Sequence, residues 1–357
     1  MRPLSLNYLE TTPSDDQGGV RSARALRRNL LLCLIGLLMG VGISEVIVRS
    51  LISVRDVGPS FTTYDAVYGT TLKKNFFAQR ITPEFTMRFT TNSDGLRGPE
   101  LGTLSSRPIL FLGDSFTMGY GVSDGEEFPA LVRRALTDRS AKKISVINAG
   151  IGNTGNGRWV KFLRSKAKLY HPGLVVLQIH ANDFEDNMRE RLFDRSPTGE
   201  LLELPVPLPG AERMIQSIVE GMPGLAYSYL IGLSRQLSWP INFPYRGSSS
   251  ERPPIDLDQS GREEQLLFRL LQEVLTMCKQ QGSQVLAVLV DIPHERLTKA
   301  VTFFSDHDVV TVVVPSKTDR PDLYYKVDGH WNASGQRFVA DRILEAIKQH
   351  STLAQVR

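Results

Sequence analysis

Short apolar runs and amphipathic stretches alternate along the chain from residue 108 onward, and this alternation constrains the fold more than any other feature of the sequence. Five runs have the length and the continuous apolar character of buried strands: Ile109–Leu112, Ile144–Ile147, Leu174–Ile179, Val285–Val290 and Val309–Val314. Strands that are apolar on both faces are typical of parallel sheets covered by helices on both sides. The alternation therefore predicts an α/β domain with a five-stranded parallel sheet.

Amphipathic segments between and after these runs predict the covering helices. Helical periodicity places them near Glu126–Thr137, Arg158–Lys168, Glu263–Gln280, Glu295–Phe304 and Ala333–Gln349. The simplest topology for this order is a flavodoxin-like three-layer α/β/α sandwich, in which ligands bind beyond the carboxyl ends of the strands. We place this domain over residues 108–349.

Two segments lie outside the alternation. Residues 54–107 are rich in Thr, Phe and Tyr and contain turn signals such as Ser93-Asp94-Gly95, which predicts a β-rich adjunct segment. Residues 184–262 include nine prolines and are too long for an ordinary connection. We interpret them as an insertion that borders the functional site; a loosely ordered surface excursion is the alternative.

The N-terminal region contains an apolar run of twenty residues, Asn29–Val48, in which Glu45 is the only charge. As a helix rising about 1.5 Å per residue, it spans roughly the 30 Å of a bilayer's hydrocarbon core. Arginines precede the run, so the positive-inside rule places the N-terminus in the cytoplasm and the later residues outside. We predict a cytoplasmic tail over 1–28 and a single-pass cell-membrane anchor over 29–53, which leaves the remaining chain periplasmic or extracellular. A cleaved signal peptide and a buried core helix are the alternatives.

Charge and cysteine content exclude several classes of protein. The net charge is +4, and five arginines against three acidic residues in the first 28 positions account for +2 of it. The rest of the chain carries too little excess positive charge to favour binding to nucleic acid. The two cysteines, Cys33 and Cys278, form no disulfide framework, and no Cys/His spacing is typical of a metal site. We therefore expect no metal, no cofactor and no nucleic-acid partner.

A serine follows the first strand-like run. That run ends in Gly113-Asp114-Ser115, after which a helix is expected. The hydroxyl of Ser115 is thereby placed at the carboxyl end of a strand, where open α/β folds build their sites. The alternative is a turn or helix-capping serine, for which Gly and Asp neighbours are equally normal.

Polar clusters also follow other runs or precede the last helix. They are Asn148-Ala149-Gly150-Ile151-Gly152-Asn153, His180-Ala181-Asn182-Asp183 and Asp328-Gly329-His330. The carboxyl ends of parallel strands meet at one edge of a sheet, so we expect these clusters to converge with Ser115. Together they supply every part that acyl transfer needs.

In such a site Ser115 attacks a carbonyl, neutral His330 takes its proton, and Asp328 holds the imidazole in the required tautomer. Backbone N–H groups of Ser115 and Gly152, with the side-chain amide of Asn182, bind the oxyanion that develops. The clusters thus predict a Ser-His-Asp triad with an oxyanion hole.

The same residues resemble the four sequence blocks of the SGNH (GDSL-type) hydrolases. The matching positions are Gly113-Asp114-Ser115, the glycine block at 148–153, Asn182-Asp183, and the late Asp328 and His330. The segment ILFLGDSFTMGYGV, the earlier Asp94-Gly95-Leu96-Arg97-Gly98 and an anchor ahead of both are similar to a membrane-anchored bacterial subgroup. The resemblance implies a serine esterase that acts on an ester-containing substrate.

Several positions depart from the family pattern. His180 stands where the third block has glycine, which makes it a rival base, and the second-block glycine is Gly152 or Gly150. Asp114 and Asp183 are secondary candidates. The last block reads D-x-H rather than D-x-x-H, and its Asp-x-His-Trp spacing is similar to that of relatives that O-acetylate polysaccharides.

Three functions from different classes therefore remain. The first is an esterase or deacetylase, with an O-acetylated carbohydrate as one candidate substrate and the lipid bilayer as a partner of the anchor. The second is an O-acyltransferase that modifies a cell-surface polysaccharide. The third is a non-catalytic carbohydrate-binding or scaffolding protein.

Overall fold

The computed structural model describes residues 17–102, 104, 107–138, 144–208, 222, 224–242, 257–350 and 353. The chain divides into two compact units, Met1–Ser53 and Val54–Arg357.

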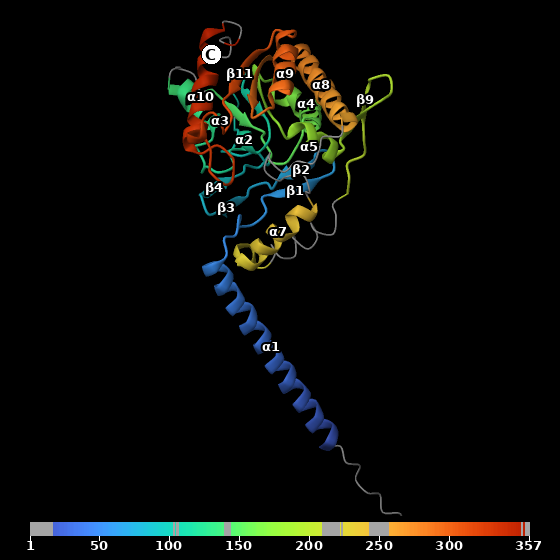
Figure 1. The fold of residues 1–357 in the computed structure, drawn as a ribbon, viewed down its shortest axis with the longest axis vertical. Coiled ribbons are helices and arrows are strands. Elements are labelled where there is room, and N and C mark those ends of the chain that lie inside the picture. Colours follow the sequence, from blue (N-terminus) through green and yellow to red (C-terminus); the bar gives the residue numbers. More distant parts are fainter. Residues whose placement is uncertain are drawn as a thin grey trace, which may run out of the picture. The chain divides into compact units, whose positions relative to one another are not determined.

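The first unit contains one long helix, α1 (Gln17–Leu51), which begins within the predicted tail (Figure 1). Its stretch Arg24–Leu51 has a mean hydropathy of 2.4 in the most apolar window, and only 6% of that window is buried in the protein. A helix that is apolar and unburied over this length is long enough to cross a membrane. A signal sequence near an N-terminus has the same character.

The second unit is built on a five-stranded sheet in the order β11-β10-β7-β5-β6, in which all neighbours are parallel. The strands are β5 (Ile109–Leu112), β6 (Val146–Asn148), β7 (Leu174–His180), β10 (Gln284–Val290) and β11 (Val310–Val314). Numbered along the chain, this order is 2-1-3-4-5 when it is followed from β6, the flavodoxin-like arrangement. The predicted α/β sandwich is confirmed, and no predicted strand boundary differs by more than two residues.

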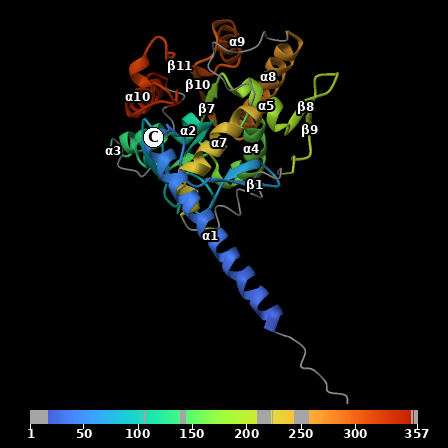
Figure 2. The same cartoon turned by 60° about the horizontal axis from the view of Figure 1, so that its bottom comes forward.

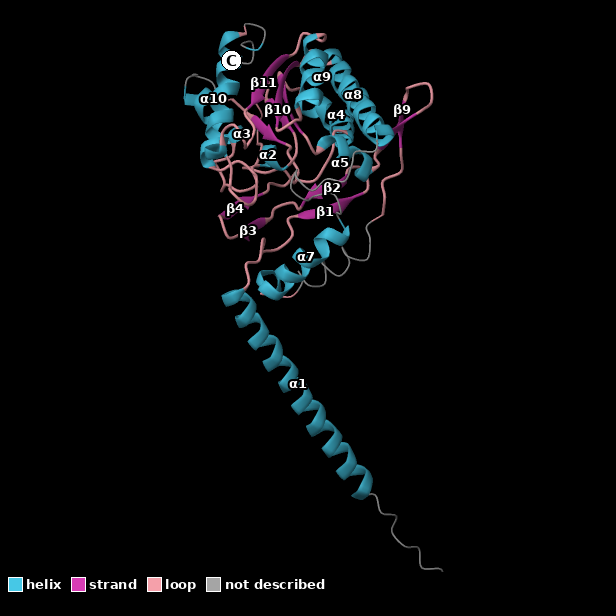
Figure 3. Ribbon diagram, viewed as in Figure 1, coloured by secondary structure: helices cyan, strands magenta, loops and turns pink. Residues whose placement is uncertain are grey.

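Helices cover both faces of this sheet (Figures 1 and 3). One face carries α3 (Phe128–Asp138) and α10 (Ala333–Gln349), and the other carries α4 (Gly157–Tyr170), α8 (Leu257–Gln280) and α9 (His294–Ser305). Successive residues of β5 point to opposite faces, as a pleated strand requires: Ile109 and Phe111 pack with α3 and α10, whereas Leu110 and Leu112 pack in the core beside α4 and α8. Two apolar cores therefore hold the sheet between its helices.

The adjunct segment forms two antiparallel hairpins, β1 (Thr62–Asp65) with β2 (Gly69–Leu72), and β3 (Phe77–Ile81) with β4 (Thr86–Thr90). It is attached to the carboxyl edge of the central sheet in two places. Leu72 packs against Met118 and Ile151, and Arg97 forms a β-bridge with Asn148, the last residue of β6. The adjunct segment thus lies beside the loops that were predicted to carry the site.

The segment predicted as an insertion starts with α5 (Asp183–Glu190), which follows β7 after two residues. The hairpin of β8 (Phe193–Arg195) and β9 (Leu201–Glu203) comes next and lies at the margin of the unit near α5 (Figure 2). The short helix η1 (Leu225–Tyr227) then leads to α7 (Tyr229–Asn242), which packs on residues 54–58. Much of the remaining predicted insertion, residues 209–221, 223 and 243–256, lies outside the described residues.

Candidate active site

Ser115 is the first residue of α2 (Ser115–Met118), a single helical turn that directly follows β5. Asp114 caps this turn, because its Oδ1 accepts the N–H of Phe116 at 2.9 Å. The turn ends at Gly119, whose φ of 84° lies in the left-handed region that favours glycine. Within residues 113–119 only Ser115 is partly exposed, so the fold presents this one side chain to solvent.

A neighbouring strand and a neighbouring loop hold this turn in place. Gln178 of β7 accepts three hydrogen bonds with Oε1, from the backbone N–H groups of Asp114 and Thr117 and from the Thr117 hydroxyl. Gly150, in the loop after β6, approaches so closely that a Cβ there would lie 2.3 Å from the backbone nitrogen of Met118. Glycine is therefore needed at position 150 for packing.

His330 and Asp328 meet Ser115 from the far end of the chain. His330 Nε2 lies 2.8 Å from Ser115 Oγ, and His330 Nδ1 forms a short hydrogen bond with Asp328 Oδ1. Both residues belong to the loop that precedes α10. Burial of the Asp328 carboxyl group, whose side chain is 24% exposed, raises its pKa, but the hydrogen bonds and the charge of His330 outweigh this effect and hold the pKa below its usual value. The predicted Ser-His-Asp residues are thus brought together in one hydrogen-bonded chain.

Aromatic rings surround the imidazole. The ring centroid of Phe116 lies 5.0 Å from that of His330 and 4.7 Å from that of Trp331. The ring centroid of Tyr120 lies 4.9 Å from that of His330. Trp331 is fully buried. These rings restrict how far His330 can rotate away from Ser115.

The two candidate glycines have different neighbours. A Cβ at Gly152 would lie 3.3 Å from Ser115 Cβ, so Gly152 is directly beside the serine. Gly150 instead faces the backbone of Thr117 and Met118. Gly152 is thus the glycine that lies beside the serine, whereas Gly150 packs against α2.

Asn182 and His180 form a separate local network. Asn182 Oδ1 lies 2.5 Å from His180 Nδ1, and Asn182 Nδ2 donates to Asp186 Oδ2 at 2.9 Å. An amide nitrogen carries two N–H groups, so the second can serve another acceptor. The His180 ring stacks on Phe116, with its Nδ1 engaged by Asn182. The histidine that hydrogen-bonds Ser115 in the structure is His330.

Asp114 and Asp183 support the site from the interior, and both are fully buried. Asp183 Oδ2 accepts the backbone N–H of His180 at 3.0 Å. Burial, and after it the charge of Asp114, raise the pKa of Asp183 well above its ordinary value. These two carboxyl groups hold the turns that follow β5 and β7.

Sequence reasoning missed the role of Arg97. Its side chain is buried and donates to the carbonyl groups of Met118, Gly119 and Val122 at 2.6–2.9 Å. It therefore secures the chain directly after α2. The sequence shows the motif at 94–98, but Arg97 binds backbone carbonyl groups, which are the same in every residue type, so the sequence does not mark its partners.

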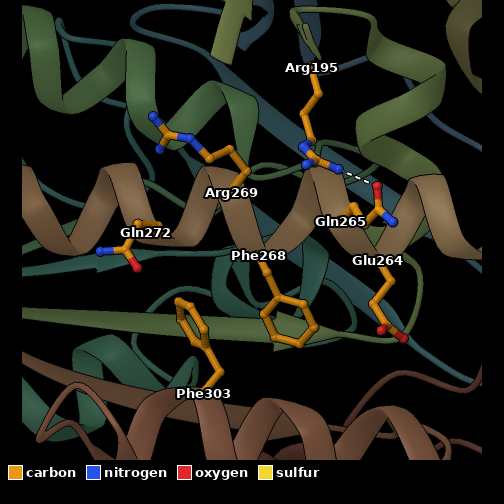
Figure 4. Close-up of a pocket in the computed structure, with 7 residues that line it drawn as sticks. All are labelled: Arg195, Glu264, Gln265, Phe268, Arg269, Gln272 and Phe303. Carbon is orange, nitrogen blue, oxygen red and sulfur yellow. Dashed lines mark hydrogen bonds between the residues drawn. The ribbon is translucent and has the colours of Figure 1, made fainter. Parts of the chain in front are cut away.

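A separate pocket of about 380 Å³ is lined mainly by residues of α8 and α9 (Figure 4). Phe268 and Phe303 pack against each other in it, and Arg195 of β8 donates to Gln265. None of its lining residues is a predicted site residue. Within the described part of the chain, no group of three or more His, Cys, Asp or Glu side chains is arranged to hold a metal ion.

The sequence of residues 109–343 matches the family described as GDSL-like lipase/acylhydrolase. The match covers well over half of the chain and includes every predicted site residue. The chain belongs to this family. It is accordingly an SGNH/GDSL hydrolase of the esterase and acylhydrolase class. A comparison with curated proteins finds no match.

Solved structures similar to this GDSL-type chain include the psychrotrophic esterase EstA from Pseudoalteromonas sp., in a form inhibited by monoethylphosphonate. It is 15% identical with a TM-score of 0.41, and the alignment covers 68% of this chain and 98% of the esterase. A lipase/acylhydrolase from Enterococcus faecalis is 17% identical with a TM-score of 0.38, over 68% and 96% of the two chains. A putative acylhydrolase from Bacteroides fragilis NCTC 9343 is 13% identical with a TM-score of 0.40, over 72% and 93%.

Proposed function

We propose that this hydrolase is a membrane-anchored serine esterase or deacetylase that cleaves esters outside the cytoplasmic membrane, through Ser115, His330 and Asp328. The observation that carries the proposal is the hydrogen-bonded chain from Ser115 Oγ through both imidazole nitrogens to Asp328. A nucleophile, a base and a group that orients the base are the parts that acyl transfer requires. The apolar helix α1 supports the anchor, with the lipid bilayer as its partner.

The reaction follows from this geometry. Ser115 Oγ attacks the ester carbonyl as its proton moves to His330 Nε2, and the carbonyl π electrons move onto oxygen. When the tetrahedral intermediate collapses, the C–O bond to the alcohol breaks and His330 returns the proton to the leaving oxygen. A water then attacks the acyl-enzyme by the same sequence, which releases the acid and restores Ser115. Asp328 stabilises the His330 imidazolium that forms during acylation and again during deacylation of Ser115.

The oxyanion is bound by the backbone N–H groups of Ser115 and Gly152 and by the second N–H of the Asn182 amide. The position of Gly152 beside Ser115 supports this assignment. Removing one such donor typically lowers the rate by about 10²–10³. Asn182→Ala should therefore reduce kcat by about that factor with little change in KM, and a folded variant with wild-type kcat would remove Asn182 from the site.

A second candidate reaction differs from ester hydrolysis only in the molecule that accepts the acyl group. If a carbohydrate hydroxyl replaces water, the same acyl-enzyme yields an O-acylated polysaccharide. The spacing Asp328-x-His330-Trp331, similar to that of polysaccharide O-acetyltransferases, favours this alternative. Esterase action on an O-acetylated carbohydrate and O-acylation of a carbohydrate are distinguished by whether the product loses or gains acyl groups.

The test is turnover of p-nitrophenyl acetate by the full-length protein in detergent. Ser115→Ala and His330→Ala should each abolish nearly all turnover, and the double variant should be little worse, because residues that act as one unit are strongly non-additive. Additive losses would mean that the two residues do not act together. Retention of carbohydrate binding without turnover by the wild-type protein would favour the non-catalytic alternative.

A further inference from the structure

The tip of the second adjunct hairpin reaches the loop that carries Asp328. The turn between β3 and β4 places Glu84 against residues 326–328, more than 240 positions later in the chain. Its carboxylate accepts three consecutive backbone N–H groups. Oε1 accepts that of Lys326 at 2.7 Å, and Oε2 accepts those of Val327 at 2.9 Å and Asp328 at 2.7 Å.

This arrangement suits a carboxylate. Successive N–H groups that converge on one point form a concavity that binds anions. Hydrogen bonds to an ionised acceptor are shorter and stronger than neutral ones, and two of the three distances here are 2.7 Å. Glu84 therefore occupies an anion site made by the backbone of the Asp328 loop.

The loop is held mainly by polar contacts. Lys326 and Val327 are exposed, Val327 at 71%, and Asp328 is exposed as a residue although its side chain is partly buried. Besides Glu84, the Lys317 ammonium holds the segment by donating to the carbonyl of Lys326 at 2.7 Å. Hydrogen bonds to its backbone thus contribute much of what keeps Asp328 in place.

Phe85, the next residue of the hairpin tip, contacts the same region. Its ring centroid lies 4.6 Å from that of Tyr325 and 5.5 Å from that of Tyr120. The backbone N–H of Tyr325 donates to the carbonyl of His330 at 2.9 Å, and the Tyr325 hydroxyl donates to the carbonyl of Gly121 at 2.9 Å. The hairpin tip therefore meets the loop through an aromatic ring as well as through the carboxylate.

We infer that Glu84 is a positioning residue for the triad: it fixes the backbone of residues 326–328 so that the Asp328 carboxylate meets His330 Nδ1. The inference rests on the proposed function of Ser115, His330 and Asp328. A displacement of about 1 Å in a catalytic group can cost roughly 10²-fold in rate. The hairpin turn itself is secured independently, since the Thr82 hydroxyl accepts the backbone N–H groups of Glu84 and Phe85.

The experiment compares Glu84→Ala, Glu84→Gln and Glu100→Ala in the full-length protein, with kcat, KM and melting temperature measured on each preparation. Glu100 is the matched control, because it accepts hydrogen bonds from the N–H and hydroxyl of Ser93 in the same segment. We expect Glu84→Ala to lower kcat by about 10²-fold with KM changed less than about threefold. Glu84→Gln, which keeps one acceptor oxygen, should recover part of that loss, and Glu100→Ala should match the wild type.

The outcomes distinguish the positioning role of Glu84 from the proposed esterase function. If Ser115→Ala abolishes turnover while Glu84→Ala remains folded with kcat close to that of the wild type, the positioning role is wrong and the triad stands. If Ser115→Ala retains turnover, the proposed function itself fails. Failure of both Glu84 variants to fold would overturn the inference, because Glu84 would then serve folding rather than alignment.

Discussion

The two halves of the candidate site differ in how deeply they are buried. The nucleophile turn, residues 113–119, is buried except for Ser115 and is packed so tightly that Gly150 leaves no room for a Cβ. The acid–base loop, residues 326–330, is mostly exposed; its backbone N–H groups donate to Glu84, and Lys317 donates to one of its carbonyl groups. Buried packing and buried hydrogen bonds therefore fix the nucleophile, whereas the exposed backbone before its base depends on hydrogen bonds to Glu84 and Lys317.

This difference predicts different consequences of mutation. A change in a packed region costs stability, because neighbouring atoms cannot move apart freely. A change in an exposed, hydrogen-bonded loop leaves the core intact and alters alignment instead. Substitutions that crowd the nucleophile turn should therefore act mainly on folding, and substitutions in the acid–base loop mainly on kcat.

The largest effect is expected at the acid–base loop from Asp328→Asn. An amide in place of the carboxylate favours the wrong tautomer of His330 and no longer stabilises the imidazolium, and the equivalent change in serine proteases lowers kcat by about 10⁴. The melting temperature should stay close to that of the wild type. Steady-state kinetics with p-nitrophenyl acetate measure the loss, and a kcat close to that of the wild type would show that Asp328 does not orient the histidine.

A pair of glycine substitutions tests the comparison directly. Gly150→Ala places a Cβ against the backbone of α2 and should cost about 3 kcal/mol of unfolding free energy or prevent folding. Gly329 has a φ of 88°, and an added Cβ there would meet no atom of the described residues within 4 Å, so Gly329→Ala meets backbone strain alone, about 1–2 kcal/mol. Urea unfolding followed by tryptophan fluorescence measures both. Equal costs at the two positions would contradict the distinction between the regions.

The last effect concerns the buried carboxyl group of Asp183 and appears only as a change of stability with pH. Its pKa is raised from 3.8, so the unfolded chain ionises at lower pH than the folded protein does. The stability that Asp183 contributes is therefore complete below about pH 3.8 and falls as pH rises toward its folded pKa. Asp183→Asn removes this dependence. The unfolding free energy of the variant minus that of the wild type should rise with pH by up to about 1.4 kcal/mol per unit within that window. A difference that is constant with pH would show that the pKa of Asp183 is not raised by folding.

The sequence was sufficient to predict the sheet and its helices because those elements depend on local periodicity. The order of the strands then followed from the rule for α/β folds, and it brought Ser115, Gly152 and His330 to one edge. The D-x-H spacing departs from the family pattern, yet it suffices here because the left-handed conformation of Gly329 lets the side chains of Asp328 and His330 meet.

The contacts of the adjunct segment were not predictable in the same way. Glu84 and Arg97 bind backbone N–H and carbonyl groups, which are common to nearly all residues, so no side-chain pattern marks their partners. The partners of Glu84 are also more than 240 positions away along the chain. The predicted β-rich character of residues 54–107 therefore did not identify which residues of the segment contact the site. The domain boundaries proposed from the sequence remain predictions.

The most direct test of the central claim is labelling of the full-length protein with a fluorophosphonate, followed by mass spectrometry of its peptides. Ser115 Oγ should attack phosphorus and expel fluoride, with its proton taken by His330, so that one adduct forms on the peptide that contains Ser115. Labelling should be absent in Ser115→Ala and much slower in His330→Ala, whereas Glu100→Ala should label at the wild-type rate. An adduct of equal yield in folded Ser115→Ala, or none in the wild-type protein, would contradict the assignment of Ser115 as the nucleophile.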